Sequence, residues 1–156
     1  MSIPGRIQQF LEGRHLAELY TPDANIAALW QKALASARDA RHATTSLDNQ
    51  YVLGYQALLQ MGTAVLACAG YRTRGAQGHH ATTFFAVAAL GIDGLEKIDI
   101  RTDRIRKLRK VSAYEAGSPT AEQISGLKAL LDEMMPHAQR WLTAQRPAAV
   151  FPDYSR

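Results

Sequence analysis

The stretch from Tyr51 to Ala69 constrains the fold of this chain more than any other part of the sequence. Apolar or small residues recur there at every third or fourth position for about five turns, as expected of a helix that buries one side. Ser46 offers an N-terminal cap before the stretch, and Gly70 offers a C-terminal stop after it. The pattern therefore predicts a long helix at the centre of the core.

Four further segments favour helices packed around this central one. They cover roughly residues 26–43, 79–90, 95–113 and a last segment that reaches residue 145, with Ser118 as its cap, Pro119 at its first position and a kink at Pro136. No stretch alternates with a period of two, so no strand is expected. Short connecting loops favour antiparallel neighbours. We expect an all-α, up-and-down bundle of four to five helices.

The composition fits a single ordinary domain. The chain has 156 residues, of which 47% are hydrophobic and 21% charged. We expect an N-terminal arm over residues 1–25, the bundle over residues 26–145 and a flexible tail over residues 146–156. The N-terminus lacks an apolar segment of signal-peptide length, and the apolar run from Ala57 to Ala69 is short for a bilayer. A cytoplasmic protein with no membrane contact is the default expectation.

Metal and cofactor chemistry find little support in the sequence. Cys68 is the only cysteine, which excludes an internal disulfide and a zinc site built from several cysteines. The adjacent His79 and His80 would point about 100° apart on a helix, and no third ligand lies at a suitable spacing. No glycine-rich phosphate loop follows a strand. No metal and no cofactor are therefore expected.

Basic residues are concentrated between positions 101 and 110. The net charge of the whole chain is only +4, so the clustering says more than the total. Six cations fall in this segment, namely Arg101, Arg104, Arg106, Lys107, Arg109 and Lys110. Two interpretations remain open: a solvated helix end whose cations favour the helix dipole, or a surface that binds RNA, DNA or a nucleotide.

Antiparallel counting predicts where a binding site would lie. If the helices that begin near residues 26, 48, 79 and 95 alternate in direction, three helix ends meet at one pole of the bundle. The N-terminus of the third helix would favour a phosphate there. The polar residues gathered at this pole would be Tyr71, Arg72, Arg74, His79, His80, Arg109, Lys110 and Tyr114. The alternative is that they are simply the polar residues of solvent-facing loops.

The order of several short motifs resembles a known family. The motifs are Ala37–Ala40, Leu47–Tyr51, Gly54–Leu59, Gly70–Arg72, Gly78–His80, Arg104–Arg109 and Tyr114–Glu115. This order, over roughly residues 26–145, resembles the HEPN domains, which are small helical bundles. Many HEPN domains are metal-independent ribonucleases that act as dimers, often as toxins paired with a nucleotidyltransferase antitoxin. The resemblance implies a homodimer, a nucleotidyltransferase partner and a toxin–antitoxin context.

The resemblance also assigns residue roles. The family's motif is an Arg, a polar residue and then a His about five positions after the Arg. Arg109 matches the Arg and Lys110 the polar position, whereas Tyr114 stands where the His would be. A phenol, with a pKa near 10, is a poor base at neutral pH, so binding carries over better than cleavage. His79 or His80 could supply an imidazole instead.

Two functional hypotheses follow from the sequence. In the first, the chain binds RNA or a nucleotide, with Arg109 and Tyr114 as the catalytic candidates if it cleaves RNA. The binding residues would then be Arg72, Arg74, His79, His80, Arg106 and Lys110. In the second, the chain is a non-catalytic interaction module that docks a protein such as a nucleotidyltransferase.

Overall fold

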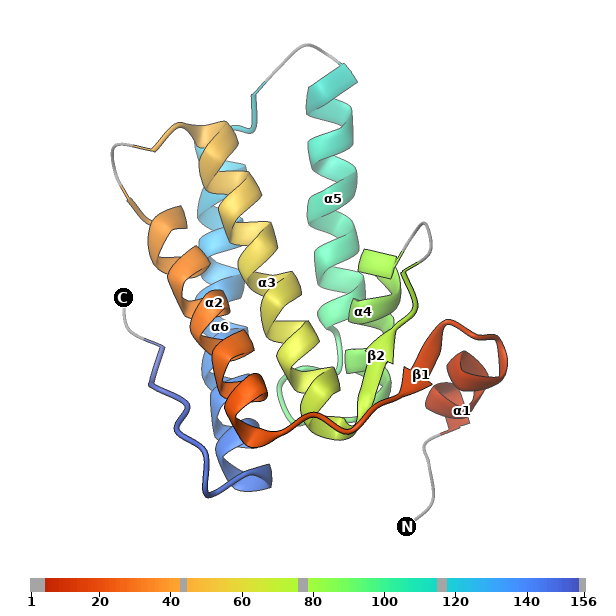
Figure 1. Cartoon of the computed structure of the whole chain (residues 1–156). Coiled ribbons are helices and arrows are strands. Elements are labelled where there is room, and N and C mark those ends of the chain that lie inside the picture. The colour runs from red at the N-terminus through yellow and green to blue at the C-terminus, as the bar shows by residue number, and fades with distance from the viewer. Residues whose placement is uncertain (1–4, 43–44, 76–78, 115–117, 155–156) are drawn as a thin grey trace.

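The computed structural model describes residues 5–42, 45–75, 79–114 and 118–154, together with their side chains except those of 79 and 108–114. Six helices and two short strands make up the described residues (Figure 1). In chain order they are α1 (Gly5–Glu12), β1 (Leu16–Glu18), α2 (Asp23–Ala40), α3 (Leu47–Ala69), β2 (Tyr71–Thr73), α4 (His79–Ala89), α5 (Ile98–Tyr114) and α6 (Ala121–Gln145). The expectation of a mostly helical protein is confirmed.

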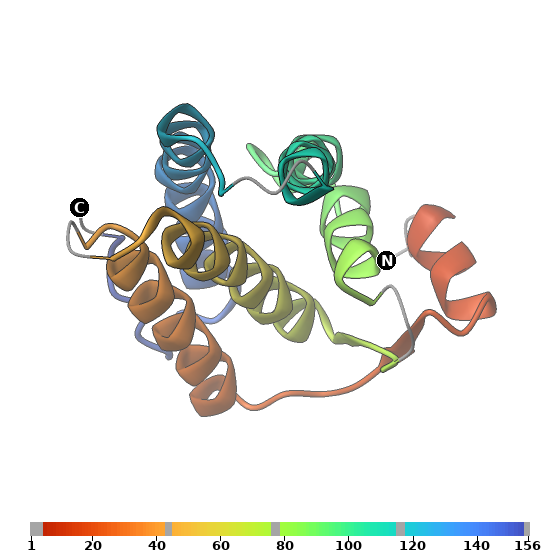
Figure 2. The same cartoon turned by 90° about the horizontal axis from the view of Figure 1, so that it is seen from above.

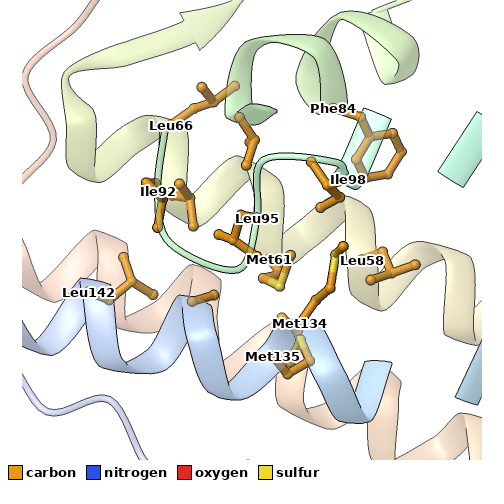
Figure 3. Packing of buried hydrophobic residues seen from close by; sticks show 14 of the residues in the cluster. Leu58, Met61, Leu66, Phe84, Ile92, Leu95, Ile98, Met134, Met135 and Leu142 are labelled. Atoms are coloured by element: carbon orange, nitrogen blue, oxygen red, sulfur yellow. The ribbon is translucent and has the colours of Figure 1, made fainter. Parts of the chain in front are cut away.

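Helix α3 forms the centre of the molecule, as its spacing predicts. It packs against α2 on one side, against α6 on another and against α4 near its C-terminal half. Its buried residues meet side chains from α4, from the segment before α5 and from α6 (Figure 3). Met61 and Leu58 are fully buried in this cluster, and Trp30 of α2 is equally inaccessible. One continuous apolar core therefore holds the helices together.

Local signals fix both ends of α3 as the sequence predicts. The Ser46 hydroxyl accepts a hydrogen bond of 3.2 Å from the backbone N–H of Asn49. Gly70 ends the helix in the left-handed region with a φ of 96°. At α6, however, the N-cap is Thr120 rather than Ser118, because Thr120 and Gln123 form a reciprocal capping box. The expected start of this helix was therefore two residues too early.

The expectation of an all-α bundle is wrong for two short segments. Strands β1 and β2 form a two-stranded antiparallel sheet in which Leu16 pairs with Thr73 and Glu18 with Tyr71. The backbone N–H of Leu19 extends the pairing by donating to the carbonyl of Gly70 at 2.9 Å. Each strand has only three residues, too few to show an alternating pattern.

Strand β2 also reverses the direction of the chain before α4 begins. It leads back alongside the last turns of α3, so that α4 then runs in the same direction as α3 (Figure 1). The expectation that α3 and α4 run antiparallel is therefore wrong. Helix α3 ends at one end of the bundle, and α5 ends at the opposite one (Figure 1). The predicted pole, which needed these two ends together, is not formed.

The N-terminal arm packs on its own chain. Ile7 of α1 is fully buried, and α1 contacts α4. Leu16 of β1 is also buried in the common core cluster. The arm therefore covers the side of the molecule on which α4 lies.

The C-terminal segment is docked up to residue 154, contrary to the expectation of a flexible tail. Phe151 is buried in the core, and the indole N–H of Trp30 donates to the carbonyl of Pro152 at 2.8 Å. The Tyr154 hydroxyl donates to Asp132 at 2.8 Å and accepts from Arg41, which also forms an ion pair with Asp132. The burial of Phe151 and the hydrogen bonds of Tyr154 thus hold the segment against α2 and α6.

Helix α3 is long and apolar enough to cross a membrane by length and composition alone. A core helix in a soluble protein passes the same test, and 56% of the apolar window is buried by the surrounding helices. The burial is accounted for by the contacts with α2, α4 and α6.

Candidate functional site

A cleft of about 630 Å³ separates α5 from the N-terminal half of α6, with α3 contributing its first turns. Helix α5 packs mainly on α4 and touches α6 only sparsely, and its ribbon lies beside α4 and away from that of α6 (Figure 2). The residues lining the cleft are Tyr51, Arg101, Arg104, Ile105, Thr120, Glu122, Gln123, Gly126 and Leu130. We call this feature the α5–α6 cleft. Its volume falls within the range of roughly 300–1,000 Å³ typical of small-molecule sites.

The two arginines of the cleft differ in their electrostatic surroundings. Arg101 forms an ion pair with Glu133 of α6, so much of its charge is balanced. Arg104 is exposed and has no carboxylate partner among the residues that the structure describes. An unpaired guanidinium presents several N–H donors in a plane, which suits a phosphate or a carboxylate. Arg104 is therefore the cation most available to a ligand.

The neighbouring cations of α5 are engaged within their own helix. Asp103 accepts from Arg106 at 2.6 Å and lies 3.0 Å from the ammonium nitrogen of Lys107. The hydrogen bonds from Lys107 and then from Arg106 hold the pKa of Asp103 below its usual value. This carboxylate stays ionised at neutral pH and partly offsets the two cations.

Aromatic side chains form the α3 wall beside these charges. Tyr51 stacks on Tyr55 with ring centroids 6.1 Å apart, and Tyr55 meets Phe84 of α4 edge-on at 5.7 Å. Burial raises the pKa of the Tyr55 hydroxyl, against the opposing effect of the Arg106 guanidinium. Tyr55 is therefore a neutral structural ring, which supports Tyr51 where Tyr51 lines the cleft.

The first turn of α6 closes one end of the cleft. The capping box occupies the N–H of Gln123 and leaves those of Ala121 and Glu122 without a helix acceptor. The carboxylate of Glu122 lies on the same turn and offsets the positive end of the helix dipole. The cleft thus combines an apolar floor, from Ile105 and Leu130, with a mixed-charge rim.

The structure separates most of the residues that the sequence suggested for binding. Arg72 lines another pocket, of about 300 Å³, formed with α2, α3 and α4. Arg74 and His80 are exposed beside β2 and at the start of α4. Arg106 lies on α5, paired with Asp103. These four residues do not line the α5–α6 cleft.

The remaining candidates fall outside the described side chains. The backbone of Arg109, Lys110 and Tyr114 belongs to the last turns of α5, and that of His79 to the first turn of α4. Their side chains are not among those that the structure describes. Their assigned roles therefore stay predictions.

Sequence reasoning counted Arg101 and Arg104 among the basic residues but did not select them. A spacing signal was available, because residues 101, 104 and 105 fall on one face of a helix. Tyr51 and Tyr55 are four residues apart, a spacing that fits either a core or an interface position, and the structure brings Tyr51 to the cleft. The cleft itself depends on the packing of three helices, which the sequence alone does not give.

The thiol of Cys68 is expected to react slowly with disulfide reagents. Its side chain is buried at the end of α3, and this burial raises its pKa, so little thiolate exists at neutral pH. We expect a disulfide reagent such as Ellman's to react with the native protein at least about tenfold more slowly than with the urea-unfolded chain. Immediate stoichiometric reaction of the native protein at pH 7 would contradict this expectation.

Among the residues that the structure describes, no group of three His, Cys, Asp or Glu side chains could hold a metal ion.

Comparisons with known proteins do not extend these observations to a family. The chain matches no protein-family model, and no curated protein or solved structure shows significant similarity to it. The HEPN resemblance therefore stays a prediction drawn from the order of residues.

Proposed function

We propose that this chain is an HEPN-like domain that binds RNA or a nucleotide, and that the α5–α6 cleft receives a phosphate of the ligand. The observation that carries the proposal is the guanidinium of Arg104, which has no carboxylate partner among the described residues, at a cleft of about 630 Å³ that the ring of Tyr51 also lines. A phosphate satisfies such a guanidinium, and a base stacks on such a ring. The HEPN resemblance adds the expectation of a homodimer and of a toxin–antitoxin context.

The proposal covers binding and does not extend to cleavage. A general base with a pKa near 7 is the usual requirement for activating a ribose hydroxyl. Tyr114 replaces the histidine of the HEPN motif, and an ordinary phenol is protonated at that pH. Arg109 would contribute by holding a phosphate near the end of α5.

A second candidate function is a non-catalytic interaction module. It draws support from Ile100 on α5 and Val52 on α3, which expose 60% and 56% of their surface, and from the apolar floor of the cleft. In this function, a protein such as a nucleotidyltransferase would dock on α5. The two functions differ in salt dependence, because phosphate binding weakens steeply with added salt and an apolar interface does not.

Arg104→Ala tests the proposal directly. We expect this variant to bind labelled RNA or a nucleotide about tenfold more weakly, since it removes a charge-assisted hydrogen bond. Arg38→Ala is the matched control: it removes the same charge from an exposed position on α2, which does not line the cleft. Equal affinities for both variants and the wild type would exclude the cleft as the phosphate site.

The same assay, run without metal, reports cleavage. Arg109→Ala and Tyr114→Phe are the informative variants, because they remove the two catalytic candidates of the HEPN motif. Cleavage by the wild type that Arg109→Ala abolishes would extend the proposal to a ribonuclease and direct attention to His79 and His80. Salt-insensitive capture of a protein partner, with no binding of RNA or nucleotide, would favour the interaction module.

A further inference from the structure

We infer that the α5–α6 cleft accepts one nucleotide with a single phosphate, such as a nucleoside monophosphate, rather than a length of RNA. This inference rests on the proposed function and specifies the ligand of the same site. It follows from the distribution of charge in the cleft, from the arrangement of its apolar wall and from its volume.

The charges around the cleft suit one phosphate and oppose several. Only Arg104, of the two arginines lining the cleft, lacks a carboxylate partner among the described residues. Negative charge is present at the same cleft: Glu122 lines it, and Glu133 pairs with Arg101, which also lines it. An RNA strand that continued past Arg104 along α6 would bring further phosphates close to the carboxylates of Glu122 and Glu133. Phosphates and carboxylates are both negative and repel each other. Arg104 therefore marks a position for one anionic group.

The apolar part of the cleft suits one base. Tyr51 comes from α3, Ile105 from α5 and Leu130 from α6, so three helices contribute apolar surface to the same space. The stacking of Tyr51 on Tyr55 fixes its ring before any ligand arrives, which lowers the entropy lost on binding. Ile105 and Arg104 line the same cleft, so a base against Ile105 and a phosphate on Arg104 would belong to one small ligand.

The volume agrees with this stoichiometry. About 630 Å³ is sufficient for a compact small molecule and is far from the extended groove that tracks several nucleotides of a strand. The sparse contact between α5 and α6 leaves room for such a molecule to enter between the two helices.

The test is a titration of the full chain with four probes: a nucleoside monophosphate, the matching nucleoside, inorganic phosphate and a single-stranded RNA of twelve or so nucleotides. We expect one monophosphate to bind per cleft, with an affinity that falls only weakly as salt is added, because a single phosphate releases no condensed counterions. Arg104→Ala should weaken monophosphate binding about tenfold and leave nucleoside binding unchanged. Tyr51→Leu should weaken monophosphate and nucleoside binding alike, and Tyr51→Phe should restore both.

Each other outcome has a separate meaning. RNA that binds far more tightly than the monophosphate, with log K falling against log salt with a slope of about −4 or steeper, would overturn this inference and leave the proposed function standing. Inorganic phosphate that binds as well as the monophosphate would also overturn it, because the base would then contribute nothing. Binding of none of the probes would overturn both the inference and the proposed function. The comparison among probes uses the wild type, so it holds even if a variant fails to fold.

Discussion

Trp30→Ala is expected to lower the free energy of unfolding by about 3–5 kcal/mol, the range for truncating a large buried aromatic side chain. Trp30 is fully buried on α2, and its indole N–H donates to the carbonyl of Pro152 at 2.8 Å. Alanine would leave a cavity between α2 and the core and remove the hydrogen bond that holds the C-terminal segment. The variant should therefore also release residues 147–154, since Phe151 packs into the same core.

Urea unfolding followed by circular dichroism measures the first effect, because the substitution itself alters tryptophan fluorescence. Hydrogen exchange in the C-terminal segment measures the second. Trp30→Phe is the matched control, since it keeps an aromatic ring in the core but loses the hydrogen bond to Pro152 and part of the indole volume. We expect this control to cost about 1–2 kcal/mol. A Trp30→Ala protein as stable as the wild type would show that this packing does not support the fold.

Gly94→Ala is expected to destabilise the protein by about 3 kcal/mol, from strain in the backbone and overlap of side chains. Gly94 has a φ of 86°, a region that residues with a Cβ rarely adopt. A Cβ built at this position would also overlap the imidazole ring of His137 on α6. Gly94 therefore allows the segment before α5 to lie directly against α6.

Gly91→Ala separates the two contributions to that loss. Gly91 also has a positive φ, of 70°, but a Cβ there would meet nothing within 4 Å. It should lose only the backbone part, about 1 kcal/mol. The double variant Gly94→Ala/His137→Ala should recover the steric part, as measured by thermal or urea unfolding. Equal losses for Gly91→Ala and Gly94→Ala would mean that the contact with His137 contributes nothing.

The parts of the fold that depend on nearby residues could be predicted from the sequence. The apolar spacing of α3, its cap at Ser46 and its stop at Gly70 are local signals, and the structure confirms all three. The same holds for the general positions of α2, α4 and α6. Each of these features is decided by residues within one or two turns of each other.

The features that the sequence did not predict depend on residues far apart in the chain. The pairing of Leu16 with Thr73 creates strands that neither segment shows alone, and it reverses the chain before α4. Phe151 docks on α2 and α6, and the sequence around Phe151 does not show that these helices receive it. The α5–α6 cleft likewise arises because α5 packs more extensively against α4 than against α6. Knowledge of packing was needed in each case, and periodicity alone does not provide it.

The pairing of β1 with β2 has a consequence for how the protein is made. Strand β1 leaves the ribosome before its partner β2, which is synthesised more than fifty residues later, after α2 and α3. Pairing across such a distance has to overcome the entropy of closing a long loop, which the prior formation of the α2–α3 pair reduces. We therefore expect residues 5–18 to remain unpaired until β2 has been synthesised, and their docking on β2 and α4 to be a late step in folding.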